Sequence, residues 1–166
     1  MMATIFKLFR HNPDDPHSLS GNAIRALLED HAGVLWIGTW SKGLNQFDRE
    51  TERFMRYRDN PDDPYSLSND SIRTMYEARS GTLWVGTMGG LNKYNRDSKQ
   101  FTRYVHNPDD SNSLSHNSVR VIYKDQAGVL WVGTEGDLDQ FEPATERFHV
   151  TPMIPIVSML TVFGQF

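Results

Sequence analysis

The sequence of 166 residues contains no cysteine. Without cysteine the protein forms no disulfide, no zinc–thiolate site and no thiol nucleophile, although this absence does not fix the compartment. Basic residues are not in excess either, because 17 Lys and Arg stand against 21 Asp and Glu, which gives a net charge of −4. They are scattered among carboxylates and form no basic stripe. A nucleic-acid partner and an anionic membrane surface are therefore not expected as targets.

Long hydrophobic segments are also missing. Met1–Arg10 has no charged start followed by an apolar core of about 7–15 residues, so no signal peptide is recognised there. The stretch from Met153 to Phe166 is strongly apolar, but its 14 residues are too few to span a bilayer. We therefore expect no membrane insertion by this segment.

The sequence does contain an internal repeat. The segment Gly33–Thr39 (GVLWIGT) returns as Gly81–Thr87 (GTLWVGT) and as Gly128–Thr134 (GVLWVGT). The tryptophans of these segments are 48 and 47 residues apart. A self-similar unit of this length is typical of architectures in which each unit completes its core against its neighbours.

Each unit has the pattern of four short strands. In the second unit the loop Asn60–Ser68, rich in Pro, Asp and Ser, precedes segments rich in β-branched and aromatic residues that turns separate. Helical periodicity is absent, so the pattern predicts an antiparallel β-meander. The strand around each tryptophan is nearly all apolar, which predicts that both of its faces are covered. The glycine after it would let a neighbouring sheet approach closely.

A four-stranded unit of about 45 residues with both sheet faces buried is typical of a propeller blade. The expected fold is all-β, with three four-stranded antiparallel blades plus an extra N-terminal strand. Within a single propeller-repeat segment, 1–166, the expected boundaries are an extra outer strand at 5–11, blades at 12–58, 59–105 and 106–151, and a divergent apolar tail at 152–166. Propellers close with about four to eight blades. Three blades therefore form a partial propeller, or half of a dimeric six-blade ring that closes head to tail.

The segments Leu67–Arg73, Gly81–Thr87 and Gly89–Asn95, with the loop Asn60–Ser66, closely resemble the two-component regulator propeller repeat. The resemblance covers residues 5 to about 151. It implies an extracytoplasmic, periplasmic sensor of a hybrid histidine kinase, often tuned to polysaccharide breakdown products. The sandwich domain, membrane helix and kinase that typically follow in that family are not recognised here. The third unit departs from the pattern at Asp139, where the other units have Asn.

Conventional metal and catalytic sites are not indicated. Paired aspartates such as Asp62 and Asp63 recur beside proline at one loop position of every unit, which favours Asx-type turns over a calcium site. The six histidines form no His–Glu or His-x-x-x-His pair, and His11 and His106 share one repeat position, which suits a polar loop residue. A nucleophile elbow and a phosphate loop are absent. The sequence predicts no catalytic residue, metal site or cofactor.

The four tryptophans divide into two groups. Trp36, Trp84 and Trp131 lie within all-apolar strands, which predicts core positions rather than platforms for sugar rings. Trp40 occurs once, in a loop of variable length at the position that Met88 and Glu135 fill in the other units. Both a ligand contact and an ordinary surface aromatic remain open for Trp40.

Arginine recurs at one position near the start of the first strand of each unit. The propeller resemblance implies that this strand lines the central channel, and that the loop entering it shares a face with the turn between the second and third strands. This face would suit an anionic or hydroxyl-rich ligand. The candidate ligand-binding residues are Asn22, Arg25, Trp40, Lys42, Asn69, Arg73, Met88, His116, Asn117, Arg120 and Glu135. The alternative is that each arginine pairs with a carboxylate of its own blade, such as Glu29, Glu77 or Asp125.

The function expected is a non-catalytic sensory segment of a two-component-type signalling protein, with an oligosaccharide as ligand. Its expected protein partner is a second copy of the chain or the neighbouring blades of a longer chain. One alternative is a protein-interaction scaffold that uses the loop-rich face. Another is a propeller lyase or hydrolase, which would require a histidine and a carboxylate that converge on one face.

Overall fold

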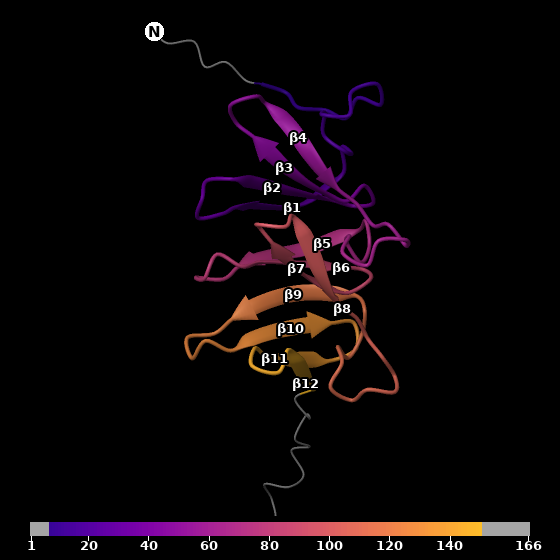
Figure 1. The fold of residues 1–166 in the computed structure, drawn as a ribbon, viewed down its shortest axis with the longest axis vertical. Helices are drawn as coiled ribbons and strands as arrows, with labels where there is room; N and C mark the ends of the chain where they lie inside the picture. Colours follow the sequence, from indigo (N-terminus) through magenta and orange to yellow (C-terminus); the bar gives the residue numbers. More distant parts are fainter. Residues whose placement is uncertain (1–6, 151–166) are drawn as a thin grey trace, which may run out of the picture.

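The computed structural model describes residues 7–150. In these residues it contains twelve strands in three four-stranded antiparallel sheets, each with its strands in chain order (Figure 1). The first sheet, blade 1, consists of β1 (Ile24–Glu29), β2 (Leu35–Thr39), β3 (Leu44–Asp48) and β4 (Arg53–Tyr57). Blade 2 consists of β5 (Ile72–Glu77), β6 (Leu83–Thr87), β7 (Leu91–Asn95) and β8 (Gln100–Tyr104). Blade 3 consists of β9 (Val119–Lys124), β10 (Leu130–Thr134), β11 (Leu138–Glu142) and β12 (Arg147–Val150).

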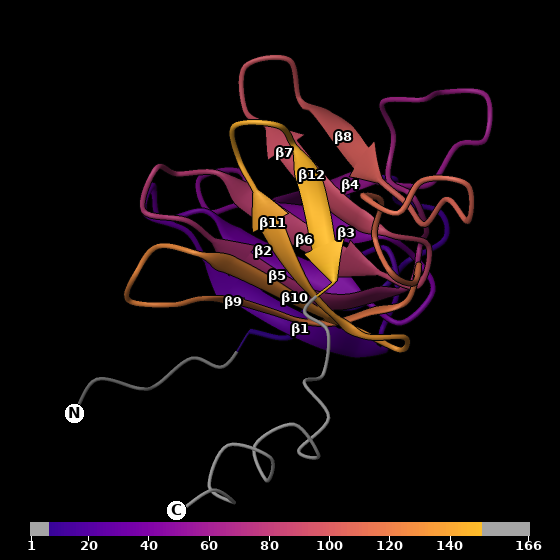
Figure 2. The same ribbon diagram turned by 90° about the horizontal axis from the view of Figure 1, so that it is seen from below.

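The three sheets stack face to face along the long axis of the molecule. Blade 1 lies at one end, blade 2 in the middle and blade 3 at the other end (Figure 1). The first strands β1, β5 and β9 lie next to one another on one side of the stack, and the fourth strands lie on the opposite side (Figure 2). The predicted all-β architecture of three propeller blades is thereby confirmed.

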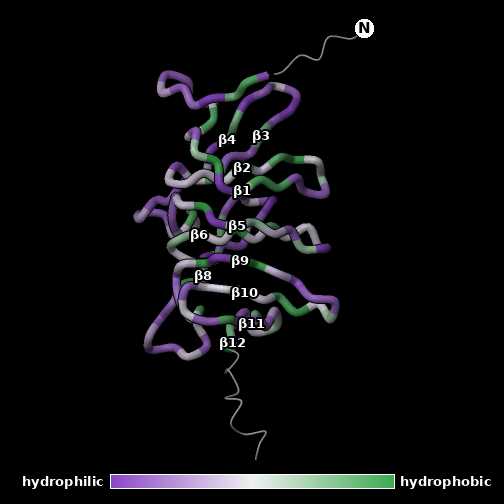
Figure 3. Tube along the Cα trace, turned by 180° about the vertical axis from the view of Figure 1, so that it is seen from behind, coloured by the Kyte–Doolittle hydropathy of each residue, from purple (hydrophilic) through white to green (hydrophobic). Residues whose placement is uncertain are grey.

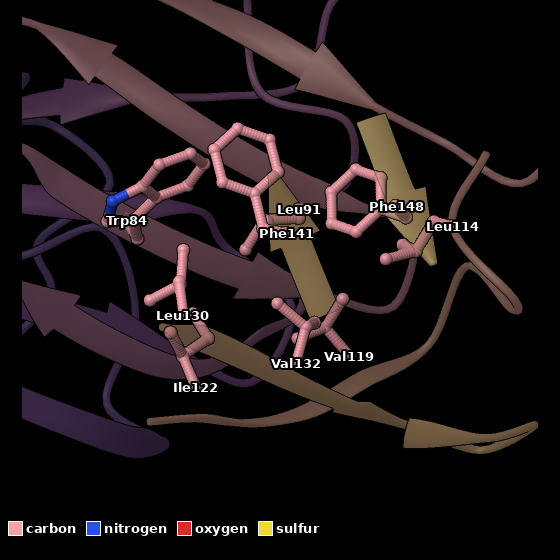
Figure 4. Packing of buried hydrophobic residues seen from close by; sticks show 9 residues of the cluster. All are labelled: Trp84, Leu91, Leu114, Val119, Ile122, Leu130, Val132, Phe141 and Phe148. Carbon is pink, nitrogen blue, oxygen red and sulfur yellow. The ribbon is translucent and has the colours of Figure 1, made fainter. Parts of the chain in front are cut away.

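The hydrophobic core lies between the sheets. Trp36 and Leu44 of blade 1 are fully buried against blade 2, and Trp84 and Leu91 of blade 2 pack in the same way against blade 3 (Figure 4). The prediction that the repeated tryptophans belong to the core is confirmed for these two. Trp131 is only half-buried, because no fourth blade covers its face of the sheet in the described residues. The long loops before the first strands are largely hydrophilic (Figure 3).

A glycine in each second strand makes the close contact between sheets possible. A Cβ atom on Gly38 would lie 2.5 Å from a methyl carbon of Ile72, and one on Gly86 would lie 2.6 Å from a methyl carbon of Val119. Contacts this short do not occur between carbon atoms, so only glycine fits at the two seams. The predicted role of these glycines is confirmed.

The aspartate-rich loops are built as the sequence predicts. The second aspartate of each pair accepts a hydrogen bond from the backbone N–H two residues later, at 2.9 Å for Asp15, Asp63 and Asp110. Arg56 and Arg103 on the fourth strands bind carbonyl groups of their own loop. Residues 7–150 contain no group of three or more His, Asp or Glu side chains that could hold a metal ion. The hydrogen bonds to Asp15, Asp63 and Asp110 hold the turns within these loops.

The extra N-terminal strand expected at 5–11 does not form in the part that the structure describes, because residues 7–11 pair with no strand. The segment corresponds to the fourth strand of a blade, which pairs with the third strand of the same blade. That third strand would belong to a blade before blade 1, and the described chain has none. Phe9 instead packs edge-on against Phe47 and Phe54, with ring centroids 5.0 and 5.7 Å apart. Residues 5 and 6 and the apolar tail at 152–166 lie outside the described residues.

The departure at Asp139 has a structural consequence. The equivalent Asn45 and Asn92 are fully buried, and each donates an amide hydrogen bond to the carbonyl of the preceding strand, Ile37 at 3.2 Å and Val85 at 3.0 Å. Asp139 is also fully buried, but a carboxylate has no N–H to donate. Burial raises its pKa, and the negative charge of Asp137 adds to this, against the opposing hydrogen bonds from Ser115 and the charge of His106.

We expect Asp139→Asn to raise the free energy of unfolding at pH 7 by about 1–2 kcal/mol, because it removes a buried charge and supplies the missing donor. A carboxyl whose pKa is higher in the folded state stabilises the fold below its unfolded pKa, and this contribution is lost as the pH rises through the folded pKa. The advantage of the variant should therefore shrink toward pH 4. Urea unfolding of both proteins between pH 4 and 7 measures it, and an advantage independent of pH would contradict the explanation.

Candidate functional site

The three arginines of the repeat occupy a special backbone position. In blade 1 Ile24 pairs with Thr39 and Ala26 with Gly38, so Arg25 is an extra residue in the ladder, a β-bulge. Arg73 and Arg120 occupy the same place in β5 and β9, where the pairing shifts in the same way. A bulge turns a side chain out of the regular alternation of the strand. Because β1, β5 and β9 are neighbours, the bulges line up along the inner side of the blades; we call Arg25, Arg73 and Arg120 the arginine row.

The turns between second and third strands lie beside the arginine row. The first residue of each turn donates its backbone N–H to the carbonyl just before the first strand: Trp40 to Ala23 at 2.8 Å, Met88 to Ser71 at 3.1 Å and Glu135 to Ser118 at 3.0 Å. The expectation that this turn and the loop entering the first strand open on one face is met. We call this surface, with the arginine row, the entry face.

Trp40 joins blades 1 and 2 on the entry face. The guanidinium carbon of Arg25 lies 3.7 Å from the centroid of the Trp40 ring, and that of Arg73 lies 5.4 Å from it. Both distances fall within the range of cation–π contacts. The ring is 39% exposed, so it remains accessible beside the two cations.

The three arginines differ in their ionic partners. Arg120 forms an ion pair with Glu135 in its own blade. Arg25 and Arg73 have no carboxylate within 4.0 Å among the described residues, and the buried Nε of Arg73 has no hydrogen-bond partner there. The proposed alternative partners are engaged elsewhere, because Glu29 binds Arg49 at 2.9 Å and Glu77 binds Arg96 at 2.8 Å. Two adjacent positive charges are therefore left without counter-charges.

Four other candidate residues use their side chains to hold the loops. Asn22 and Asn117 accept the backbone N–H of His11 and His106, at 2.8 and 2.7 Å. Asn69 and His116 each accept the N–H of the residue two positions later, at 2.8 and 3.0 Å. His11 and His106 bind the carbonyls of Leu19 and Leu114 at 2.8 Å, which agrees with the structural role that their repeat position suggested. The four candidate side chains thus hold the loops of the entry face, and one acceptor atom of each is already used in a hydrogen bond.

Lys42 and Met88 remain open to solvent. Lys42 is exposed, and only its backbone N–H is fixed, by the Thr39 hydroxyl at 3.0 Å. Met88 is 42% exposed, at the position of Trp40. The structure thus brings together Arg25, Trp40 and Arg73, and separately Arg120 and Glu135. The bulges that aim the arginines leave no trace in the residue types, so sequence reasoning missed them.

A second polar cluster, also missed, joins blades 1 and 2 on the opposite face. The carboxylate of Asp30 has no exposed area and accepts hydrogen bonds from Trp36 Nε1 and from Arg96, both at 2.8 Å. Arg96 also binds Glu77, which in turn accepts the backbone N–H of His31 at 2.8 Å. Burial alone would raise the pKa of Asp30, but the hydrogen bonds from Trp36 and Arg96 and the positive charge of Arg96 hold it below its usual value. The cluster ties the two sheets together.

Three segments of the chain, residues 18–41, 66–89 and 113–136, match the model of the two component regulator propeller. Each contains the start of a blade, from the end of its loop to the turn of the entry face. A comparison with proteins of curated function finds no match. The residues described here contain no helix long and apolar enough to cross a membrane.

Solved structures support the same assignment. The extracellular domain of a protein assigned as a hybrid two-component system of B. thetaiotaomicron is 30% identical, with a TM-score of 0.71 over 80% of this chain and 19% of its own. The extracellular domain of a protein assigned as a one-component system of the same organism is 29% identical, with a TM-score of 0.63. This match covers 75% of the present chain and 17% of the other. PorZ, a surface component of the type-IX secretion system of Porphyromonas gingivalis, shares the fold at 20% identity and a TM-score of 0.53 over 71% and 17%.

The chain thus spans about a fifth of the length of these structures. All three matched segments coincide with the first two strands of a blade, and the sheets stack as blades. The chain belongs to the two-component regulator propeller family, of which it carries three consecutive repeats.

Proposed function

We propose that this segment is a non-catalytic sensory part of an extracellular signalling region, and that its entry face binds an acidic oligosaccharide. The observation that carries the proposal is the pair Arg25 and Arg73, which share the Trp40 ring and have no carboxylate partner among the described residues. Two neighbouring guanidinium groups suit carboxylates on a sugar chain, because each presents a planar fork of donors. The exposed aromatic ring offers a face for an adjacent sugar ring.

The family and the related structures support the sensory part of the proposal. The similar domains of B. thetaiotaomicron are extracellular parts of signalling systems, so a location outside the cytoplasm fits this segment. A non-catalytic role agrees with the state of the entry face. The Nδ1 atom of His116 accepts the backbone N–H of Ser118, and the Glu135 carboxylate pairs with Arg120. These contacts argue against His116 and Glu135 as a general acid–base pair.

We expect Arg73→Ala and Trp40→Ala each to weaken binding of a galacturonic acid trimer at least about tenfold, since each removes a contact to the charged ligand or its ring. Arg120→Ala should have a smaller effect, because Glu135 already neutralises that cation. Isothermal titration calorimetry of the full chain measures the affinity. Arg79→Ala is the matched control, because Arg79 is an exposed arginine in the β5–β6 turn, at the opposite face.

Neutral maltotriose serves as the second ligand. Binding of the acidic trimer that is lost in both variants and preserved in Arg79→Ala would support the entry face as the site. Equal binding of the acidic trimer by Arg73→Ala and the unaltered protein would refute the assignment of this site. Equal affinity for both sugars would show that charge is not what this segment recognises.

A further inference from the structure

Within residues 7–150, the two end blades each leave one face uncovered, at opposite ends of the stack (Figure 1). On blade 1 this face is apolar and hollowed by a cavity of about 270 Å³ lined by Phe9, Leu19, Ile24, Leu27, Leu35, Ile37, Phe47 and Phe54. On blade 3 the uncovered face carries the half-buried Trp131 and Leu138, which is 46% exposed. We call these surfaces the head face, on blade 1, and the tail face, on blade 3.

The head and tail faces carry the two sides of the contact that joins blade 1 to blade 2 and blade 2 to blade 3. Trp36 and Leu44 of blade 1 are covered by a set of blade 2, namely Leu67, Ile72, Leu83, Val85, Tyr94 and Phe101. The head face carries the same set one repeat earlier, as Leu19, Ile24, Leu35, Ile37, Phe47 and Phe54. The tail face carries the counterparts of Trp36 and Leu44, which are Trp131 and Leu138.

The apolar side chains of the head and tail faces are more exposed than their repeat counterparts between the blades. Leu27 of the head face is 65% exposed, whereas its repeat counterpart Ile122, which faces blade 2, is 6% exposed. Leu138 of the tail face is 46% exposed, whereas its counterparts Leu44 and Leu91 are fully buried. Apolar groups at these positions are buried wherever a neighbouring blade is present. Exposed apolar surface of this kind marks an interaction site.

Charge gives an independent indication. The buried pair between blades 1 and 2 joins Asp30 to Arg96. At the seam between blades 2 and 3 both members are missing together, because Ala78 takes the place of the aspartate and Pro143 that of the arginine. The two remaining members are split between the ends of the chain, as Asp125 next to the tail face and Arg49 next to the head face.

Both remaining groups are already arranged for this contact. Asp125 accepts the indole N–H of Trp131 at 2.9 Å, as Asp30 does from Trp36 at 2.8 Å. Arg49 binds Glu29 and the carbonyl of Gly33, as Arg96 binds Glu77 and the carbonyl of Gly81. Among the described residues, Asp125 thus lacks an arginine at the position that Arg96 takes beside Asp30, and Arg49 lacks the corresponding aspartate. The two groups lie at opposite ends of the chain.

We infer that the tail face of one copy binds the head face of a second copy, with Arg49 of the second copy on Asp125 of the first. Two copies related by a twofold rotation make this contact twice and close a ring of six blades, within the range of propellers. The occupant is a second copy rather than an unrelated protein, because its head face carries both the apolar set and the arginine that the tail face lacks.

The test is sedimentation velocity of the full chain and two variants. The unaltered chain is expected to sediment at about twice 19.1 kDa. Leu27→Lys on the head face and Leu138→Lys on the tail face should each weaken self-association by roughly 100-fold, because each contact would bury a lysine. Both leucines are exposed in the single chain, so the fold tolerates the changes, and circular dichroism melts verify this. Tyr65→Lys, at a 56% exposed loop aromatic away from both faces, is the control.

Mixing the two variants distinguishes a head-to-tail contact from any other. In a mixed pair one contact unites both altered faces, and the other unites two intact faces. Each variant alone should therefore be monomeric, and the mixture should regain a two-chain species. A monomeric unaltered chain would overturn the inference, and so would a dimer that persists in both variants or is not restored by mixing. If the unaltered chain is monomeric, the neighbouring blades of a longer chain would cover the head and tail faces.

Discussion

Asp30→Ala is expected to lower the free energy of unfolding by about 3 kcal/mol, because it leaves the buried indole N–H of Trp36 without its acceptor and removes one of the two carboxylates that bind the partly buried Arg96. The Asp30 carboxylate has no exposed area and accepts hydrogen bonds from four groups: Trp36 Nε1, Arg96 Nη1 and the backbone N–H groups of Ala32 and Val34. It thus closes the β1–β2 turn and anchors blade 2 on blade 1. Guanidinium chloride unfolding at pH 7 measures the loss.

Asp125→Ala, compared at a protein concentration at which the chain is monomeric, is the matched control. Asp125 makes the same local bonds, to Val129 N–H and Trp131 Nε1, but lacks an arginine partner among the described residues. Its replacement should cost less, and the difference reports the bond between blades. In the double variant Asp30→Ala/Arg96→Ala the two effects should not add, because each single change already removes the bond between Asp30 and Arg96. Strict additivity would contradict a direct pairing.

The pH dependence of the same variant gives a second check. Because the pKa of Asp30 is held low in the folded state, the ionised carboxylate stabilises the fold above its unfolded pKa of about 3.9, and this contribution is lost as the pH falls through the folded value. The gap between Asp30→Ala and the unaltered protein should therefore be full at pH 7 and narrow below about pH 4. A gap that stays constant down to pH 2 would assign the loss to packing alone.

The fold could be predicted from the sequence because it depends on local patterns that occur three times. A single strand of four to six residues is easily misassigned from its sequence pattern alone. Here the same pattern occurs in three units, so each unit supports the strand boundaries of the others. The exception is the expected strand at 5–11, whose pairing partner would have to come from outside the described chain. Trp131 deviates for the same reason, since burial depends on a neighbour that the residue itself does not encode.

The candidate site could be predicted only in part. The recurrence of arginine at Arg25 and Arg73 was visible, but not the bulge that aims both toward Trp40. The bond between Asp30 and Arg96 joins residues 66 positions apart, so it depends on how two blades stack. Its one trace in the sequence is the aspartate six residues before Trp36 and Trp131, which is absent before Trp84. Such pairs become interpretable once the repeats are superimposed in space.

Gly43→Ala is expected to lower the free energy of unfolding by about 3–4 kcal/mol, because it combines backbone strain with a steric overlap. Gly43 begins the return of the chain into β3 with φ of +77°, in the left-handed region. A methyl group there would overlap the carbonyl oxygen of Tyr57 on β4. The Gly43 N–H also donates to the carbonyl of Asp70 at 2.9 Å, so a displaced backbone would loosen the seam between blades 1 and 2.

Gly33→Ala separates the two contributions. Gly33 has almost the same dihedral angle, φ of +76°, but nothing lies within 4 Å of the position of its Cβ. Its replacement should therefore cost only the strain of the left-handed conformation, about 1 kcal/mol. Thermal and urea unfolding of the two variants compare the same chemical change at two positions of equal backbone geometry. Equal losses would mean that strain dominates and that the entry-face turn tolerates a methyl group. A loss at Gly43 about three times larger would show that the close contact with β4 is what requires glycine in this turn.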